Sequence, residues 1–437
     1  MLPEIVTAIP GPRSAALGER LKEVECRNTT FVSEDWPIFW ERAEGANVWD
    51  ADGNRFLDLT SAFGVATLGH GFAKNALVSQ ADRLLHAMGD VHPATLKVEL
   101  CEKISAITYG RWTGGRGKTL LGNSGFEAVE AALKTAALAT GRTGIVAFEN
   151  AYHGLGYGSL LGAGIPWFRT PFEKQLAQIT QRLPFPKSSA AMDAFRKALS
   201  SVDGSTISAV LVEPMQGRGG IVIPPPEFLR ELRQWCDANG ALLVADEIYT
   251  GLNRTGKLFG CDHSEIVPDL LCLGKALSGG FPISACVGKA EIMDAWPETH
   301  GEALHTSTFL GNPLGCAMAI ASLEEHSKPE TSVLSSAIGE RFHRRLSDLS
   351  ELHEIITETR GVGMMRAIEL RHPDGSPAGD IAIRMVNSLL KEGIIILPDA
   401  PEGHVIAFTP PIITTTEELD FTVNKISGVL TQCSGGL

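Results

Sequence analysis

Four side chains that can do chemistry follow apolar runs that predict strands of one parallel sheet. These side chains, each with the run that precedes it, are Ser124 (118–121), Tyr152 (145–148), Asp246 (241–245) and Lys275 (270–273). In an open parallel sheet, ligands bind outside the carboxyl ends of the strands. We therefore expect the four side chains to contribute to one ligand site.

Lys275 and Asp246 carry charges at places where charges are costly. Lysines are mostly exposed, and desolvation lowers the pKa of a lysine and makes its amine nucleophilic, as Schiff-base chemistry requires. An aspartate at the end of an apolar run needs a cation or several donors, and a protonated pyridine nitrogen is such a cation. The alternatives are a lysine that snorkels at the sheet rim, and an aspartate in a helix cap or a salt bridge.

Ser124 and Glu127 form an S-x-x-E capping box, which predicts that a helix begins here. Gly125 allows a ligand to approach the backbone closely, and the first N–H groups of a helix bind phosphate. The alternative is an ordinary helix cap. Tyr152, at a strand end, can stack on a flat cofactor ring, or it can be a packed core aromatic.

Together these features predict one cofactor. A phosphate site, a stacking aromatic, a carboxylate for a ring nitrogen and an amine for an aldehyde match the four parts of pyridoxal 5'-phosphate. In such a site the protein orients the cofactor and tunes its electronic properties. We therefore predict pyridoxal 5'-phosphate as the cofactor and no metal ion.

The elements around these residues predict the fold class. The strands named above, with another at 209–212, alternate with helices at 127–140 and 226–239. This βαβ alternation predicts an α/β fold with a mostly parallel central sheet and helices on both faces. A hairpin is predicted at 47–59, a long helix at 329–349, a loop at 372–380, and strands near 363–370 and 394–397. We predict an N-terminal segment of a small domain (1–60), a large cofactor-binding domain (61–325) and a C-terminal small α+β domain (326–437).

Composition narrows the function classes. The net charge is −13, which argues against nucleic acid or an anionic membrane as a partner. The eight cysteines are scattered without metal-ligand spacing, which is typical of free thiols. No apolar run approaches the roughly 20 residues that span a bilayer, and the N-terminus lacks an apolar signal core. A cytoplasmic protein is expected.

Several stretches resemble the class III (ω-type) aminotransferases of the fold-type I pyridoxal-phosphate superfamily. They include NSGFEAVEAALKTA (123–136), ADEIYTGLNRTGKLFG (245–260), PDLLCLGKALSGGFPISA (268–285) and HTSTFLGNPLGCA (305–317). The resemblance extends from about residue 35 to 425, and IPGPRS (9–14) is similar to a subgroup that contains broad-specificity ω-aminotransferases and amino-acid racemases. It implies a large domain with a mostly parallel, seven-stranded-type central sheet, plus a smaller α+β domain.

The resemblance also implies roles for individual residues. Lys275 looks like the Schiff-base lysine, Asp246 the partner of the pyridine nitrogen, Ser124, Gly125 and Phe126 the phosphate cradle, Tyr152 the ring-stacking aromatic with His153 beside it, Glu213 a supporting acid near the cofactor, and Thr308 a hydroxyl that reaches the phosphate of the other subunit. A homodimer with its active site at the subunit interface follows from this last role.

The sequence departs from the family pattern at four positions. Phe126 stands where many members have Ser or Thr, and Tyr249 where Gln is common beside the cofactor's 3-hydroxyl. Arg218 stands where many members that act on ω-amino acids have Glu. Ala407 stands where members that clamp an α-carboxylate have Arg. In relatives the Glu at the position of Arg218 pairs with that Arg, so both partners of the pair are replaced here. Phe63 is a candidate for the wall of the substrate pocket.

The expected activity is transfer of a primary amino group from an ω-amino acid, a diamine or an amino sugar to a 2-oxo acid such as pyruvate or 2-oxoglutarate. Arg218 is a candidate for holding an acidic group of either substrate. A racemase or aminomutase of the same fold is the alternative, because the cofactor, Lys275 and Asp246 would be the same. A non-catalytic protein that kept the fold would have no need of the lysine.

Overall fold

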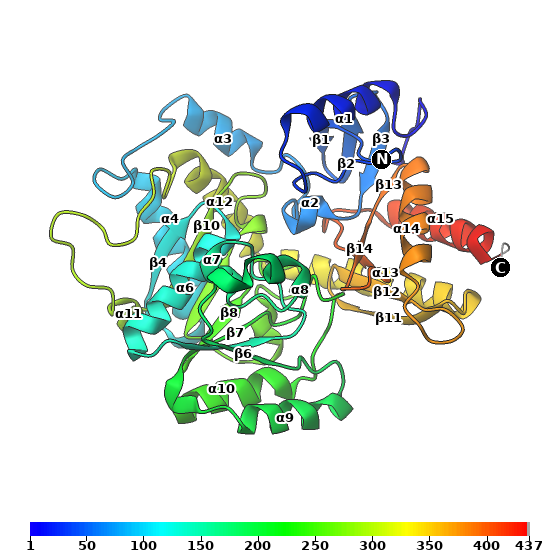
Figure 1. Ribbon diagram of the computed structural model, residues 1–437. Helices are drawn as coiled ribbons and strands as arrows, with labels where there is room; N and C mark the ends of the chain where they lie inside the picture. The colour runs from blue at the N-terminus through cyan, green and yellow to red at the C-terminus, as the bar shows by residue number, and fades with distance from the viewer. Residues whose placement is uncertain (435–437) are drawn as a thin grey trace. The chain divides into compact units, whose positions relative to one another are not determined.

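The computed structural model describes residues 1–434, which fold as two compact units (Figure 1). The larger unit is residues 72–336, and the smaller consists of residues 1–71 with the chain from 337 onward. The expected boundaries lay earlier, after residues 60 and 325. Residues 61–71 belong with the smaller unit, where Ser61 Oγ donates a hydrogen bond to the Thr409 carbonyl (2.6 Å). The larger unit extends to residue 336, since Ser335 Oγ donates to the Asn253 carbonyl (2.6 Å).

The larger unit contains a seven-stranded sheet in the order β4-β10-β9-β8-β7-β5-β6. The strands are β4 (Gly117–Gly122), β5 (Gly144–Phe148), β6 (Thr180–Leu183), β7 (Ile207–Val212), β8 (Leu242–Asp246), β9 (Leu270–Leu273) and β10 (Ser284–Lys289). Neighbouring strands from β9 to β6 are parallel, whereas β10 is antiparallel to both β4 and β9. The predicted mostly parallel sheet is confirmed.

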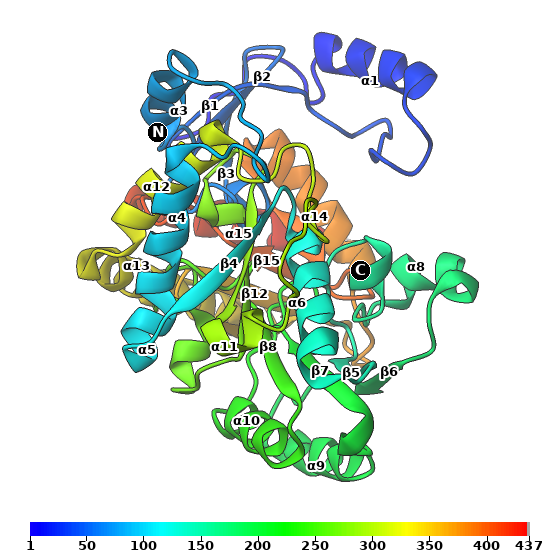
Figure 2. The same cartoon turned by 90° about the vertical axis from the view of Figure 1, so that its left-hand side faces the viewer.

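Helices cover both faces of this sheet. The unit contains α3 (Lys74–Ala81), α4 (Thr95–Ser105), α5 (Arg111–Thr113), α6 (Gly125–Thr140), α7 (Tyr157–Leu160), α8 (Pro166–Arg169), α9 (Met192–Ser200), α10 (Glu227–Asn239), α11 (Ala290–Met293), α12 (Pro313–His326) and the start of α13 (Pro329–Leu352). Figure 2 shows α4 and α6 on opposite sides of β4, and α9 beside α10.

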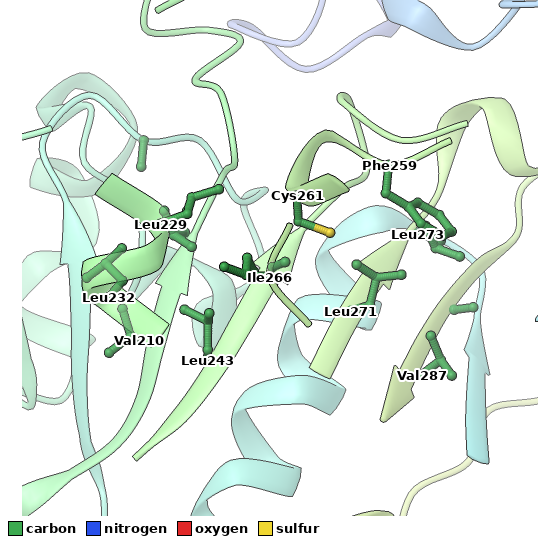
Figure 3. Packing of buried hydrophobic residues seen from close by; sticks show 14 of the residues in the cluster. Val210, Leu229, Leu232, Leu243, Phe259, Cys261, Ile266, Leu271, Leu273 and Val287 are labelled. Atoms are coloured by element: carbon green, nitrogen blue, oxygen red, sulfur yellow. The ribbon is translucent and has the colours of Figure 1, made fainter. Parts of the chain in front are cut away.

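The core of the larger unit reflects the two-residue repeat of its strands. Val244 packs in the cluster under α6, whereas Leu243, the residue before it, packs in the cluster on the other face. Figure 3 shows Leu243 beside Leu229 and Leu232 of α10. Because successive strand residues point to opposite faces, apolar runs such as β7 and β8 bury both faces of the sheet, and only the strand ends are left for polar side chains.

The smaller unit contains two four-stranded sheets, in the orders β1-β2-β3-β13 and β11-β12-β15-β14. Its elements are α1 (Pro12–Val24), β1 (Trp40–Glu44), β2 (Asn47–Asp50), β3 (Arg55–Asp58), α2 (Ser61–Gly64), β11 (Ile356–Val362), β12 (Met365–Leu370), α14 (Gly379–Lys391), β13 (Ile394–Ile395), β14 (Leu397–Asp399), β15 (Val405–Phe408) and α15 (Thr416–Ser434). The antiparallel pair β2–β3 confirms the predicted hairpin. Among residues 1–434, no helix is both long and apolar enough to cross a membrane.

Candidate active site

A cavity of about 420 Å³ lies in the larger unit, at the carboxyl ends of β5, β7, β8 and β9 and the first residues of α6. Its lining comprises Gly125, Phe126, Tyr152, His153, Gly154, Leu155, Glu213, Arg218, Asp246, Ile248, Tyr249 and Lys275. Nine of these were predicted as site residues from the sequence. The cavity is within the size range of small-ligand sites, roughly 300–1,000 Å³.

Asp246 ends β8 as a buried carboxylate with two protein donors nearby. Its Oδ2 atom lies 2.7 Å from His153 Nδ1, and its Oδ1 atom accepts a hydrogen bond from the Ile248 N–H (3.1 Å). Both side chains of the Asp246–His153 pair are buried. A carboxylate accepts about four hydrogen bonds, so Asp246 retains capacity for a cationic N–H group in the cavity.

Lys275 follows β9 at a strained backbone position. Its φ angle is +45°, in the left-handed region, which costs a non-glycine residue on the order of 1–3 kcal/mol and is concentrated at functional sites. The Nζ atom lies 4.1 Å from the centre of the Tyr249 ring. Gly217 packs against this ring, because a Cβ added there would overlap Tyr249 Cδ1. The structure thus presents the amine of Lys275 against an aromatic wall.

Glu213 is a buried carboxylate that joins two segments of the site. It accepts hydrogen bonds from the Tyr152 N–H at Oε1 (2.9 Å) and from the Gly217 N–H at Oε2 (2.9 Å). Burial raises the pKa of Glu213 to about 7; His153 opposes this rise and Asp246 adds to it. Glu213 therefore fixes the segment that carries Tyr152 relative to the loop that carries Arg218.

The raised pKa of Glu213 makes a pH-dependent contribution to stability. The folded protein keeps a proton on Glu213 that the unfolded chain releases near its ordinary pKa of 4.5, so the contribution falls as the pH rises towards 7. In the cofactor-free protein, Glu213→Gln removes this titration. The free energy of unfolding of the variant relative to wild type is expected to rise by about 2 kcal/mol from about pH 5 to about pH 8.

Urea denaturation at several pH values measures this difference. Glu247, which is also buried with a pKa raised to about 7, is present in both proteins, so its titration cancels. A difference that stays flat over the range would show that Glu213 is already ionised in the folded protein.

The start of α6 combines features of an anion site. The Glu127 carboxylate accepts hydrogen bonds from the N–H groups of Asn123 and Ser124, the second at 3.0 Å. The Ser124 Oγ atom is buried and hydrogen-bonds no group among the described residues. The first N–H groups of a helix have no acceptor within the helix. An anion with several oxygens would satisfy both the hydroxyl and these N–H groups.

Ile248 and Gly125 set the distance between the helix start and the strand ends. A Cβ added to Gly125 would lie 3.0 Å from Ile248 Cδ1, closer than ordinary packing allows. A Cβ on Gly154, whose φ angle is +96°, would overlap the Cβ of Phe126. These contacts explain the glycines. Phe126 packs against Gly154 and provides no hydroxyl at this position.

Tyr152 stands edge-on to Phe168, with ring centres 5.4 Å apart. Burial raises the pKa of its phenol, and Arg218, whose guanidinium carbon lies 5.7 Å from the ring centre, opposes that rise. The ring is held by Phe168 on α8 and by the backbone bond to Glu213. A side chain fixed in this way can offer one face to a flat ligand ring.

Thr308 and Phe63 are not among the residues that line this cavity. Thr308 is exposed in the loop that precedes α12. Phe63 belongs to the smaller unit, where Ser61, Ala62 and Phe63 all have positive φ angles, and 56% of its surface is exposed. The roles expected for both residues stay predictions. The N–H groups of Thr60 and Ala62 donate hydrogen bonds to the Asp58 carboxylate, and these bonds hold the turn that displays Phe63.

Sequence reasoning did not single out three lining residues, Gly154, Leu155 and Ile248. Ile248 lies two residues after Asp246, so the end of β8 was the available signal. Gly154 and Leu155 follow the predicted His153 directly. As a whole, the cavity offers an amine, a carboxylate for a cationic N–H, an anion site and an aromatic face.

Comparison with known proteins identifies the family. Residues 31–430 match the model of the family described as aminotransferase class-III. The chain is 32% identical to the 4-aminobutyrate aminotransferase of Mycobacterium leprae over 98% of both chains, and 34% identical to the 5-aminovalerate aminotransferase of Pseudomonas aeruginosa over 92% of this chain and 94% of that one.

Solved structures agree with this match. The amine transaminase of an uncultivated Pseudomonas species, determined in a form with bound pyridoxal phosphate, superposes with a TM-score of 0.84 at 26% identity, over 94% of this chain and 99% of that one. The family match covers most of the chain, and the relatives align over nearly their whole lengths. The chain therefore belongs to the class-III aminotransferase family and is an enzyme, a transaminase.

Proposed function

We propose that this transaminase uses pyridoxal 5'-phosphate to move a primary amino group from an ω-amino acid, a diamine or an amino sugar to a 2-oxo acid such as pyruvate or 2-oxoglutarate. It acts on small molecules in the cytoplasm, as a homodimer. One observation carries the proposal: Lys275 and the His153-supported Asp246 line the same cavity as the start of α6.

The residues of the cavity fit the cofactor. The buried Ser124 hydroxyl, which hydrogen-bonds no described residue, and the first N–H groups of α6 suit a phosphate. Asp246 suits a protonated ring nitrogen, and Tyr152 offers a face to the ring. Tyr249 lies beside the Lys275 amine, and the family resemblance implies that it would stand near the cofactor's hydroxyl.

Bound pyridoxal phosphate supplies an aldehyde that reacts reversibly with amines and a ring that withdraws electrons from the substrate carbon. Asp246 holds a proton on the ring nitrogen, and His153 keeps the carboxylate oriented through its 2.7 Å contact. Lys275 Nζ anchors the cofactor, then removes the proton from the substrate carbon as a general base. Glu213 keeps Tyr152 in position against the ring.

The donor class rests on the smaller unit and on the relatives. Ala407 lies on β15, buried and paired with Ala367 and Leu397, so this position has no guanidinium to clamp an α-carboxylate. Two of the relatives are named for 4-aminobutyrate and 5-aminovalerate, both ω-amino acids. A donor whose amine is distant from any carboxylate has no need of that clamp.

Two half-reactions, each followed separately, test the proposal. The protein loaded with cofactor is mixed with 4-aminobutyrate, 5-aminovalerate or a diamine without acceptor, and the amino form of the cofactor is quantified. Added pyruvate or 2-oxoglutarate is then expected to restore the aldehyde form. Conversion by ordinary α-amino acids alone would contradict the donor class. No net conversion, with loss of optical rotation from a chiral amino acid, would favour the racemase.

The proposed dimer surface lies around Thr308. Leu85, Met88, Val91 and Phe309 each expose more than half of their surface. The segment before α4 and the loop before α12 are joined here, because Thr306 Oγ1 donates a hydrogen bond to an Asp90 carboxylate oxygen (2.8 Å). An exposed apolar patch of this kind marks an interaction site. We assign it to a second copy of this chain, whose phosphate site receives the Thr308 hydroxyl.

A charge in this patch is expected to weaken the dimer. Met88, 55% exposed, loses no internal packing in Met88→Glu, but the new carboxylate would be buried against the partner. We expect the dissociation constant of the dimer to be at least about tenfold higher in the variant than in the wild type, with parallel loss of cofactor from the monomer. Sedimentation at several concentrations measures the effect. Val333→Glu, an exposed apolar position outside the patch, is the control; an active wild-type monomer would refute the assignment.

A further inference from the structure

A second cavity of the larger unit lies beside β6, at one edge of the seven-stranded sheet. Its volume is about 20 Å³, and its lining includes two arginines, Arg169 and Arg182, with one acid, Glu173. Arg169 ends α8, whereas Arg182 and Thr180 lie on β6. A single water molecule takes roughly 10–15 Å³ on this scale, so the space suits a ligand of one atom.

The two guanidinium groups bring more positive charge to this cavity than its one acid can balance. Among the described residues, their hydrogen bonds go to backbone carbonyls. Arg169 Nη1 donates to Ala163 (2.8 Å), and Arg182 donates through Nε to Ala163 (3.1 Å) and through Nη2 to Leu161 (2.7 Å). Burial lowers the pKa of Arg182 and the nearby Arg169 lowers it further, whereas Glu173 opposes the decrease. A negative charge between the arginines would therefore stabilise both.

Two donors that line the cavity also lack an acceptor. The Arg169 Nε atom and the Thr180 Oγ1 atom are buried and hydrogen-bond no group among residues 1–434. A buried donor without a partner is destabilising. An anion accepts from N–H and O–H donors together and offsets the excess positive charge, whereas a water molecule offsets no charge.

The cavity is connected to the residue proposed to stack on the cofactor ring. Phe168 of α8 stands edge-on to Tyr152, with ring centres 5.4 Å apart. The Gly164 N–H, next to a carbonyl that both arginines bind, donates to the Ala151 carbonyl (2.9 Å), directly before Tyr152 in the chain. A ligand that holds the two arginines together therefore also fixes the segment that supports Tyr152.

We propose that this cavity binds a chloride ion, held by Arg169, Arg182 and Thr180, which fixes α8 and, through Phe168, the position of Tyr152. The ion is a structural ligand and takes no part in the chemistry. The site itself does not depend on the proposed function; only the consequence for the bound cofactor rests on it.

Thermal unfolding in chloride and in gluconate, at equal ionic strength, tests the binding. The protein is saturated with pyridoxal phosphate, so that chloride does not occupy the phosphate site. Replacing gluconate by about 200 mM chloride should raise the Tm of the wild type by about 2–4 °C, because a ligand that binds only the folded state stabilises it. Thr180→Val should lose at least about half of this rise, and Arg169→Gln nearly all of it.

Thr119→Val is the matched control for Thr180→Val. The Thr119 Oγ1 atom is also buried without a partner among the described residues, but it lies on β4, at the opposite edge of the sheet. This variant should keep the full rise. A crystal grown in bromide should show an anomalous peak between Arg169 Nε and Thr180 Oγ1. An equal rise in wild type, Thr180→Val and Arg169→Gln, or a bromide crystal with only water at this place, overturns the inference.

The visible circular dichroism of the bound cofactor tests the connection to Tyr152. It should differ between gluconate and chloride in the wild type, but not in Thr180→Val. A chloride-dependent Tm without this difference would refute the connection. A protein that binds no pyridoxal phosphate would instead overturn the proposed function, and the Tm values of the variants would still decide whether the chloride site exists.

Discussion

Replacing Lys275 by alanine is expected to lower kcat by at least about a thousandfold while the protein still folds and binds pyridoxal phosphate. In the proposed mechanism the lysine supplies both the amine that anchors the cofactor and the base that moves the substrate proton, and general-base catalysis alone contributes about 10²–10⁴-fold. The proposed phosphate and ring contacts involve Ser124, Tyr152 and Asp246, which remain in the variant. The cofactor therefore stays bound without its covalent link.

The measurement is turnover with 5-aminovalerate and pyruvate, together with the cofactor content after gel filtration. Lys257→Ala is a matched control, because Lys257 is an exposed lysine whose bond is to the Asp262 carbonyl outside the cavity. A small primary amine added to Lys275→Ala should recover part of the rate, since it replaces the missing base. Turnover within about tenfold of wild type would remove Lys275 from the mechanism.

Asp246→Asn is expected to give the second largest loss, about a hundredfold or more in kcat, with modest change in cofactor affinity. A neutral amide cannot stabilise a proton on the ring nitrogen, so the ring withdraws electrons less strongly from the substrate carbon. The amide is nearly isosteric, and its oxygen can still accept from the Ile248 N–H or face His153 Nδ1. Folding should therefore be preserved.

Comparison with His153→Phe separates charge from orientation. This variant keeps the carboxylate but removes the 2.7 Å contact, so its loss should be smaller than that of Asp246→Asn. Asp237→Asn, at a surface position that pairs with Arg233, is the control for loss of an aspartate charge. A rate for Asp246→Asn close to wild type would show that the ring nitrogen needs no carboxylate here.

Much of the site could be predicted from the sequence because its residues follow strands. Asp246 ends β8, and Lys275 comes two residues after β9. Parallel strands bring their carboxyl ends to one edge of the sheet, so residues that are distant in sequence meet without detailed knowledge of the packing. The cavity contains both residues together with Tyr152 and Gly125, as that rule predicts.

Other features depend on contacts that no local pattern encodes. The contact between His153 and Asp246 joins residues 93 positions apart. The two hydrogen bonds that the Glu213 carboxylate accepts depend on how two loops meet. Strand β10 is antiparallel between β4 and β9, although βαβ alternation alone favours parallel strands. The role expected for Thr308 would need a second chain, which the sequence of one chain does not position.

The unit boundaries illustrate the same limit. From the sequence, the boundaries were expected after residues 60 and 325. The compact units change about ten residues later in both places, because Ser61 and Ser335 bond to distant partners, Thr409 and Asn253. Such bonds join segments 348 and 82 positions apart, beyond the reach of hydrophobic periodicity.

The most direct test of Lys275 as the cofactor-bearing residue is borohydride reduction of the protein carrying pyridoxal phosphate, followed by proteolysis and mass spectrometry of the peptides. Reduction makes the link between cofactor and lysine permanent, so the modified residue is identified without any assumption about substrate. We expect one phosphopyridoxyl group per chain, on Lys275, which follows β9. A label on another lysine, or no label on a protein that has bound the cofactor, would contradict it.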